Sequence, residues 1–321
     1  MKMFQLAMQG RGHVKEGIPC QDKTAVREEF GTRCVVLADG AGSARLSHFG
    51  ASAVVETVAA LLCREFDHFY EAAAPADVTT VILDVLHRRL QEVAEEQSCA
   101  LSDLASTLLF VACNDGRYII GQLGDGCIAF SRDGELKLVT RPEKGEFANQ
   151  TFFVTSAHAG QHFRLFKGDV GRLDGFFLMS DGAAESLYQR NTDTVAPLVR
   201  KLIIATFCKN AEWMRNAVGN IFNNEILRKT FDDCSIAVLP LYINYKDLFD
   251  RVERSEIFRF FYKKKYIHRQ YTNDYINILL HSEQTEDIAV LAELTGIKLH
   301  ILKRRLHRLR ALGFRGIFKF F

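Results

Sequence analysis

Two aspartates stand where a carboxylate is well placed to bind a metal ion, because each follows a short apolar run and precedes a glycine. Asp39 follows the run CVVLA at 34–38, and Asp181 follows FFLMS at 176–180. Runs of this length and composition are typical of buried strands. A carboxylate at the end of such a strand is held in place, and the next glycine lets a ligand approach the backbone closely.

Three further Asp-Gly pairs and one acidic doublet complete the set of candidate metal ligands. Asp115 and Asp133 lie between strand-like segments, where Asp-Gly is the ordinary chemistry of a tight turn. Asp125 also lies between two such segments and fits either a turn or a metal ligand. The doublet Asp232-Asp233 precedes another apolar run, CSIAVL. Aspartates at several strand ends could therefore meet at one site.

Clustered carboxylates would suit hard divalent cations such as magnesium or manganese, which prefer oxygen ligands. Two such ions roughly 3.5–4 Å apart can activate a bridging water and stabilise an in-line displacement at phosphorus. The spacing alone supports a metal site and a set of plain turns about equally.

The elements that would position these aspartates combine strands with helices. Helical periodicity predicts helices over 51–62, 76–97 and roughly 194–228. Short apolar or alternating segments predict strands at 107–113, 117–123, 127–131 and 135–140, arranged as an antiparallel meander, and at 234–239. Strands packed against helices predict an α+β, layered domain. The segment 141–175 has weak periodicity and is predicted to be a long irregular excursion, of the kind that is often functional or mobile.

The chain of 321 residues is 48% hydrophobic and 25% charged, which is typical of a globular protein. Its length and its charge distribution predict one large domain over 1–245 and a smaller one over 246–321. The eight cysteines are scattered without a C-x-x-C pair, so a zinc site is not expected. None is followed by the glycine-containing loop and arginine of a cysteine phosphatase, so thiolate phosphoryl chemistry is not expected either. The N-terminus lacks the apolar core of a signal peptide, and no run of about 18 apolar residues occurs. We therefore expect a cytoplasmic protein with no membrane contact.

Positive charge is concentrated in the smaller domain. Residues 246–321 contain 16 Lys and Arg against 9 Asp and Glu, whereas the rest of the chain is acidic. Segment 286–313 divides into a short helix, a turn at Gly296 and a longer basic helix, which is the outline of a helix-turn-helix, and FRGIFKFF could add a wing strand. The basic helix, KLHILKRRLHRLR at 298–310, fits an amphipathic helix packed on its own domain or a nucleic-acid or protein contact.

The motifs, taken in order, resemble the protein phosphatase 2C class of metal-dependent phosphatases, and the resemblance covers roughly residues 5–240. The motifs are Gln21-Asp22, ADGAGSA at 38–44, GQLGDG at 121–126, LMSDGAAE at 178–185 and DDCSIAVL at 232–239. The opening Gly12-His13 through Cys20-Gln21-Asp22 looks most like the bacterial branch of that family. Each motif alone is weak, but five in the family's order are specific.

The resemblance implies a four-layer α-β-β-α sandwich with two, or three, Mn²⁺ or Mg²⁺ ions at one end. Asp39 would bridge two ions, and the Gly40 carbonyl would bind the second. Asp181 and Asp232 would complete the shell of the first ion. Asp125, together with Asp181, would hold a third, weaker ion.

The remaining roles that the resemblance implies fall outside the direct ligands. Asp22 would orient metal-bound water. The excursion 141–175 would be a flap beside the active site, where substrates are selected.

The sequence also departs from the family pattern. Gln21 replaces a carboxylate ligand, and Ala41 stands where the eukaryotic members carry a general-acid histidine. The phosphate-binding arginine has no clean equivalent. Lys15 is the nearest match, with His13 and Arg11 as substitutes, although Lys15 fits a solvated surface charge and His13 a packing role as well. A lysine would bind phosphate without the bidentate geometry of a guanidinium.

The activity that the resemblance implies is Mg²⁺/Mn²⁺-dependent hydrolysis of phosphoserine and phosphothreonine in proteins, by direct attack of a metal-bridging water. The substrates would be phosphorylated proteins of a serine/threonine kinase. Two alternatives stay open. One is a pseudophosphatase that binds phosphoproteins without turnover, and the other is a DNA-binding regulator that acts through 286–321.

Overall fold

The computed structural model describes residues 2–132, 134–141, 151–241, 271–282 and 284–311. The chain divides into two compact units, Lys2–Leu241 and Tyr242–Phe321. The domain boundary expected at 245 lies outside the described residues. Among the described residues, no helix combines the length and the apolar character needed to cross a membrane.

The first unit is built around two five-stranded antiparallel sheets. One has the strand order β1-β12-β9-β6-β7, and the other has the order β2-β3-β4-β5-β8. The strands of the first sheet are β1 (Phe4–Met8), β6 (Cys127–Arg132), β7 (Glu135–Thr140), β9 (Leu173–Met179) and β12 (Cys234–Pro240). Those of the second are β2 (Lys23–Glu29), β3 (Thr32–Ala38), β4 (Leu108–Asn114), β5 (Arg117–Leu123) and β8 (Arg164–Asp169).

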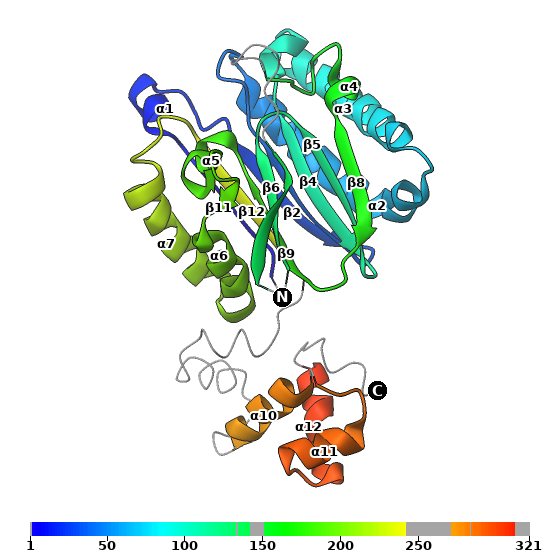
Figure 1. Cartoon of the computed structure of the whole chain (residues 1–321). Helices are drawn as coiled ribbons and strands as arrows, with labels where there is room; N and C mark the ends of the chain where they lie inside the picture. Colours follow the sequence, from blue (N-terminus) through cyan, green and yellow to red (C-terminus); the bar gives the residue numbers. More distant parts are fainter. Residues whose placement is uncertain (1, 133, 142–150, 242–270, 283, 312–321) are drawn as a thin grey trace. The chain divides into compact units, whose positions relative to one another are not determined.

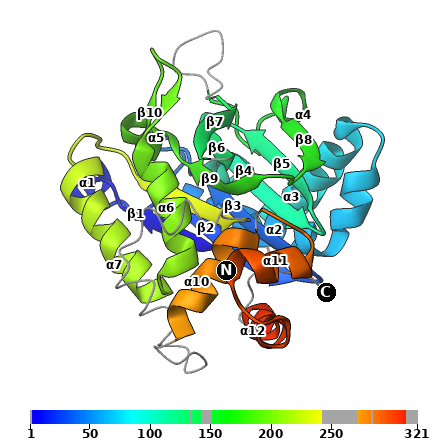
Figure 2. The same cartoon turned by 60° about the horizontal axis from the view of Figure 1, so that its bottom comes forward.

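Helices cover the outer face of each sheet, as Figures 1 and 2 show. The long helices α2 (Ser47–Glu71) and α3 (Pro75–Gln97) lie on one side, and α6 (Pro197–Cys208) and α7 (Ala211–Ile221) lie on the other. The shorter helices are α1 (Arg11–Glu16), η1 (Leu101–Leu104), α4 (Ala159–His162), α5 (Asp181–Leu187) and the π-helix η2 (Phe222–Ile226), and a small hairpin pairs β10 (Tyr188–Gln189) with β11 (Thr194–Val195).

Three apolar cores separate these layers. Phe66 and Phe110 belong to the core between α2, α3 and their sheet, while Phe177 and Phe222 belong to the core on the α6 and α7 side. A third core, which includes Leu178, lies between the two sheets. The α+β prediction with α-β-β-α layers is therefore confirmed.

The predicted meander over 107–140 is wrong in its topology, although its four strands are present. β5 pairs with β4 and β8, whereas β6 pairs with β7 and β9, so the chain changes sheet between Leu123 and Cys127. Gly124 makes the crossing possible with φ of 108°, and a Cβ on Gly126 would come within 2.6 Å of Leu109. Strand periodicity identifies strands but not their partners, because the mostly buried strands β4, β5 and β6 have similar burial patterns although they belong to different sheets.

Two other predicted segments also contain more structure than expected. The excursion 141–175 includes α4 and β8, which extends the second sheet, while its residues 142–150 lie outside the described part. The helical region predicted at 194–228 begins with β11 and is divided between α6 and α7. Asn210 begins α7 by accepting a hydrogen bond from the Trp213 N–H at 2.7 Å.

The second unit contains three described helices: α10 (Thr272–Ser282), α11 (Ile288–Thr295) and α12 (Leu299–Ala311). Asp287 caps α11 by accepting a hydrogen bond from the Ala289 N–H at 2.6 Å. Gly296 ends α11 with φ of 66°. The helix–turn–helix outline expected over 286–313 is therefore present, whereas the wing strand expected at FRGIFKFF lies outside the described residues.

Candidate metal centre

Asp39 follows β3 and is fixed through its backbone. Its N–H donates to Thr107 Oγ1 at 2.9 Å, and its carbonyl accepts from the Thr107 N–H at 2.8 Å. A Cβ on Gly40 would come within 2.8 Å of Ser47 Oγ, so only glycine fits between Asp39 and the start of α2. The sequence pattern identified the aspartate and the glycine, but not the threonine that holds them.

Asp181 begins α5 directly after β9, as the apolar run FFLMS predicts. Its Oδ1 accepts a hydrogen bond from the Gly182 N–H at 2.6 Å. A Cβ on Gly182 would lie 2.2 Å from the Asp233 carbonyl oxygen. The glycine therefore lets the start of α5 lie against the start of β12, which brings Asp181 close to the acidic doublet.

The two members of that doublet have different surroundings. Asp233 is buried, and its carboxylate accepts hydrogen bonds from the Gly10 and Gln21 N–H groups, both at 2.6 Å. His13 Nδ1 lies 2.9 Å from the same carboxylate. Asp232 is exposed, and its side chain accepts from the Asp233 N–H at 2.8 Å.

The sequence favours Asp232 as the ligand and a strand-capping or local hydrogen bond for Asp233, whereas the structure gives Asp233 the distant partners Gly10 and Gln21. Successive side chains of an extended segment point to opposite sides, so only one member of an acidic doublet can face a given site. Here Asp233 is used to attach the N-terminal segment. That arrangement leaves Asp232 as the member available to an ion.

Asp22 is the most deeply buried of the candidates, at 1% exposure. Neither of its carboxylate oxygens forms a hydrogen bond of good geometry with a described residue, although the hydroxyl groups of Ser235 and Ser180 lie nearby. Burial raises the pKa of Asp22 from 3.8 to about 7, and the nearby hydroxyl groups of Ser235 and Ser180 offset only part of the rise. Buried acceptors without partners are costly and rare in native structures, so this pair of oxygens indicates a ligand or water site.

Asp39 and Asp181 share this environment. Burial raises the pKa of Asp39 well above its usual range, and the charges of Asp22, Asp181 and Asp232 add to the rise. Burial also raises the pKa of Asp181 from 3.8 to about 6, with contributions from Asp125 and Asp232. The pKa of Asp232 is raised too, first by its partial removal from solvent. The fold therefore brings Asp22, Asp181 and Asp232 within electrostatic range of Asp39, and Asp125 within range of Asp181.

Asp125 reaches this group because it lies where the chain crosses from one sheet to the other. Its Oδ2 accepts a hydrogen bond from Thr151 Oγ1 at 2.7 Å. Thr151 is the first described residue after 142–150. Asp125 is thus both a turn residue and a neighbour of Asp181, so the two interpretations of its Asp-Gly pair are compatible.

The chemistry of these donors fits a hard divalent cation. All are carboxylates, and the ion pairs with Lys and Arg that the structure describes involve other acids. Among the described residues, no three His, Cys, Asp or Glu side chains converge closely enough to form a ligand set on their own. Magnesium and manganese sites commonly combine one or two carboxylates with waters, so a looser carboxylate group suits them.

The three candidates for binding phosphate lie in or at the start of α1 but differ in their contacts. Arg11 Nη2 donates to the carbonyl of Arg228 at 2.9 Å, and its guanidinium lies over the Phe231 ring at 4.9 Å, so Arg11 attaches α1 to the segment before β12. Lys15 is exposed. His13 alone contacts the acidic doublet. These contacts favour His13 over Arg11 as a residue beside the site.

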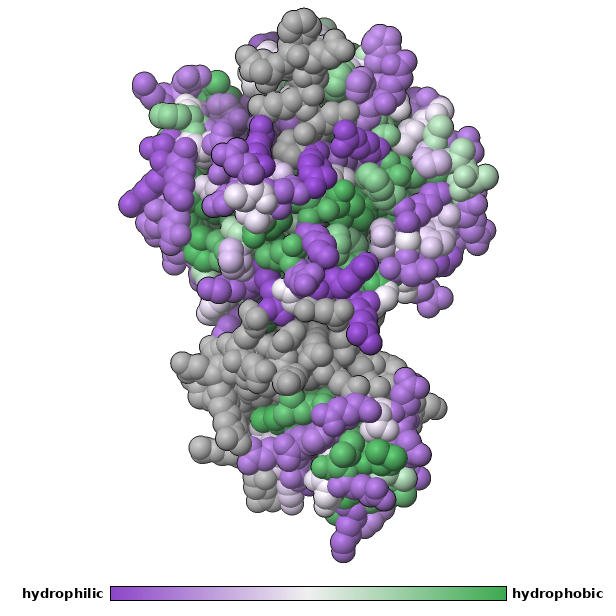
Figure 3. Space-filling view, viewed as in Figure 1, coloured by the Kyte–Doolittle hydropathy of each residue, from purple (hydrophilic) through white to green (hydrophobic). Residues whose placement is uncertain are grey.

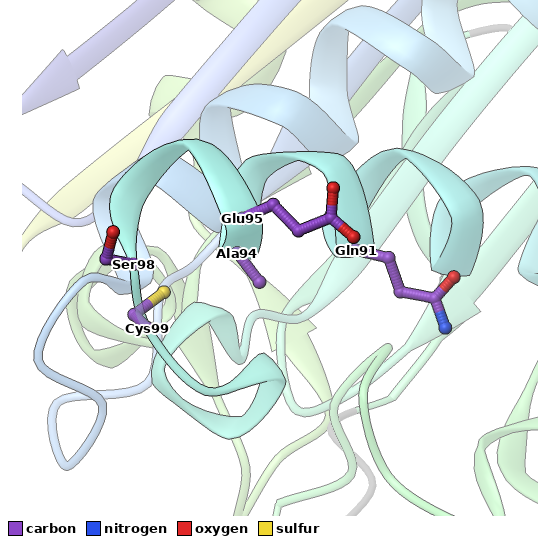
Figure 4. A pocket seen from close by; sticks show the side chains of 5 residues that line it. All are labelled: Gln91, Ala94, Glu95, Ser98 and Cys99. Atoms are coloured by element: carbon purple, nitrogen blue, oxygen red, sulfur yellow. The ribbon is translucent and has the colours of Figure 1, made fainter.

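Two cavities differ in their relation to the aspartates. One of about 500 Å³ is lined by His13, Glu185, Lys229 and Asp232, among others, and so borders the acidic doublet. Another, of about 510 Å³, lies at the C-terminal end of α3, where Figure 4 shows Gln91, Ala94, Glu95, Ser98 and Cys99. That second cavity contains none of the predicted site residues, so only the first could receive a substrate of this centre.

Comparison with known proteins places this arrangement in a family. The sequence profile of Protein phosphatase 2C matches residues 9–220, more than half of the chain. The chain belongs to the protein phosphatase 2C family. It is 28% identical over 178 residues to serine/threonine-protein phosphatase 3 of Escherichia coli (strain K12), which covers 54% of this chain and 70% of the relative.

Solved structures agree in fold. The serine/threonine phosphatase of S. agalactiae matches with a TM-score of 0.54 at 17% identity, over 75% of this chain and 99% of that one. The serine/threonine phosphatase Stp1 of Staphylococcus aureus matches with a TM-score of 0.55 at 12% identity, over 76% and 96%. At these identities the matches show a shared fold. They agree with the α-β-β-α layers found here.

Proposed function

We propose that this protein is a Mg²⁺- or Mn²⁺-dependent protein serine/threonine phosphatase that hydrolyses phosphoserine and phosphothreonine. The observation that carries the proposal is the group formed by the buried Asp22 and the half-buried Asp39 and Asp181, whose charges raise the pKa of Asp39 and which form no ion pair with Lys or Arg among the described residues. Family membership supports the same activity, and the name of the E. coli relative supports phosphorylated proteins, products of a serine/threonine kinase, as substrates.

In this proposal the aspartates divide the work of holding the ions. Asp39 would contribute to two ions and the Gly40 carbonyl to the second of them. Asp181 and Asp232 would complete the set of ligands for the first ion, and Asp125 with Asp181 would hold a third. The chemistry that bound cations would supply is an activated water for direct attack on phosphorus, without a phosphoenzyme.

The chain's other residues would orient the reactants. Asp22, whose oxygens form no hydrogen bond of good geometry with a described residue, would accept hydrogen bonds from water and so orient it toward the phosphate. His13, whose Nδ1 lies 2.9 Å from the Asp233 carboxylate, lines the cavity beside Asp232 and would contact the substrate there. Lys15 would contribute a point charge toward phosphate.

The test is the substitution Asp39→Asn, assayed on a phosphothreonine peptide with excess Mn²⁺. Loss of the shared ligand is expected to lower kcat/KM by about 10²-fold or more, because a bound metal stabilises the transition state by several kcal/mol. Asp115→Asn is the matched control. It changes another Asp-Gly pair, at an exposed turn with φ of 44° that asparagine tolerates, and is expected to leave activity unchanged.

The rival is a pseudophosphatase, and Gln21 is the feature that favours it. Its Oε1 is buried without a partner where the family has a carboxylate ligand. A protein that binds phosphopeptides but shows no turnover with either Mn²⁺ or Mg²⁺ would refute the enzymatic proposal and establish the rival.

A further inference from the structure

The helices α11 and α12 of the second unit form a helix-turn-helix that is packed on a third helix. The turn 296–298 is short, and Gly296 provides the left-handed conformation that it requires. α10 contacts both other helices, and its Tyr275 is buried, as is Leu291 of α11. Helix pairs of this kind place their second helix in the major groove of DNA in known DNA-binding proteins.

The two faces of α12 have opposite characters. Leu302, Leu306 and Leu309 are fully buried, at 0% exposure. Lys303, Arg304, His307 and Arg308 are exposed on the other side. On the face that Figure 3 shows, hydrophilic side chains of the unit's described residues surround two apolar areas.

The charge of the exposed face is of one sign. Glu293 is the last acidic residue of the sequence. The charged side chains of α12 are therefore all cationic. Asp274 of α10 forms an ion pair with Arg305, the one α12 cation that is buried, and the Arg305 guanidinium lies over the Tyr271 ring at 5.1 Å. No ion pair to Lys303 or Arg304 occurs among the described residues. Lys303, Arg304 and Arg308 therefore remain available to an external polyanion.

We propose that α12 binds duplex DNA in the major groove, with Lys303, Arg304 and Arg308 contacting the phosphate backbone. The exposed residues near its start, Leu299 and His300, then face the base edges, because the first half of a recognition helix lies deepest in the groove. This function is separate from the phosphatase activity. The matched family profile ends at residue 220 and does not include this unit.

The surroundings of α12 favour duplex DNA over other polyanions. A helix that lies on an anionic membrane inserts its apolar face into the lipid, but the leucine face of α12 is already buried within its own unit. Duplex RNA has a deep, narrow major groove that side chains cannot read, whereas the major groove of B-DNA admits an α-helix.

The test measures binding of the full-length protein to a 30-base-pair duplex of mixed sequence, across a salt series. We expect the K303A/R304A variant to bind about tenfold or more weakly at about 0.1 M salt, and the slope of log affinity against log salt to fall by about two. The matched control removes two exposed cations from the first unit, Lys201 and Arg215, by alanine substitution and should leave both quantities unchanged.

Phosphatase activity and circular dichroism of the K303A/R304A variant should match the wild type, which separates lost binding from lost folding. Absence of duplex binding by the wild-type protein at 50 mM salt would overturn the proposal. So would equal weakening by the control pair. Binding to phosphatidylserine vesicles or to duplex RNA more tightly than to DNA, with the same dependence on Lys303 and Arg304, would also overturn it in favour of that ligand.

Discussion

Two groups of like charges, one in each unit, are organised in the same way. In the first unit, Asp233 is buried and bonded to other parts of the protein, whereas Asp22 is buried and its oxygens form no hydrogen bond of good geometry with a described residue. In the second, Arg305 is buried against Asp274, whereas Lys303 is exposed. Each group thus contains one member that stabilises the fold and others that remain available to a ligand.

The groups differ in solvation, and that difference distinguishes the ligands that they suit. The aspartates lie at the end of a sandwich, where burial raises their pKa values, so a small divalent cation is the natural counter-charge. The exposed cations of α12 remain in water, where each attraction is weak, so only a partner with many charges gains much from them. Sign and burial together therefore separate a metal centre from a polyanion surface.

The comparison is tested most strongly by changing the neighbours Asp232 and Asp233 in turn. Asp233→Ala leaves two buried N–H groups without a partner and is expected to lower the free energy of unfolding by about 2–5 kcal/mol. Asp232→Ala should change it by less than about 1 kcal/mol yet lower Mn²⁺-dependent activity by about 10²-fold. Urea denaturation and phosphopeptide hydrolysis measure the two effects.

Asp233→Asn serves as the control for this pair, because its single side-chain oxygen can still accept a hydrogen bond and should recover part of the lost stability. Equal stability losses for Asp232→Ala and Asp233→Ala would show that the doublet is not divided between structure and ligand binding.

The sequence predicts the ligand positions better than the framework around them. Asp39 and Asp181 could be found because an apolar run and a glycine mark a strand end locally. Asp125 could not be placed, since the sheet crossing at 124–126 depends on which distant strands pair. The role of Asp233 was equally hidden, because its partners Gly10 and Gln21 lie more than 200 residues earlier.

In the second unit, helical spacing distinguishes Arg305 from the other cations of α12. Arg305 is three residues after Leu302 and four before Leu309, so helical spacing places it on the leucine face. Its burial was therefore predictable, although its partner on α10 was not. The five cations of α12 should not be treated as one surface.

The second prediction concerns pH and Asp22. Since burial raises its pKa from 3.8 to about 7, the folded protein binds more protons than the unfolded chain between these values. Stability in EDTA should therefore decrease as pH rises from about 4 to about 7. Asp22→Asn removes this contribution. The gain in the free energy of unfolding that the substitution gives the metal-free protein should be about 1–4 kcal/mol larger at pH 8 than at pH 4.

Urea unfolding in EDTA at the two pH values measures that difference, with Asp115→Asn as the control for an exposed carboxylate. A difference between Asp22→Asn and wild type that is the same at both pH values would contradict the raised pKa. Saturating Mn²⁺ should stabilise the wild type at pH 8, because a cation that binds only the folded state favours it.

The smallest expected effects separate Arg305 from Arg308 within α12. Arg305→Gln breaks the ion pair with Asp274 and the contact with Tyr271, and is expected to destabilise the second unit by about 1–3 kcal/mol. Arg308→Gln should change stability by less than about 0.5 kcal/mol, as is usual at exposed sites. Calorimetry of the full chain measures both values.

Duplex binding should show the opposite order, which makes the pair a test of the comparison itself. At a temperature where both variants are folded, Arg308→Gln should lower affinity about threefold to tenfold and reduce the salt slope by about one. Arg305→Gln should leave that slope unchanged, because a buried guanidinium does not contact phosphate. If Arg305→Gln reduced the slope as much as Arg308→Gln, the buried cation would belong to the DNA surface, and the division between structural and ligand-binding charges would fail in this unit.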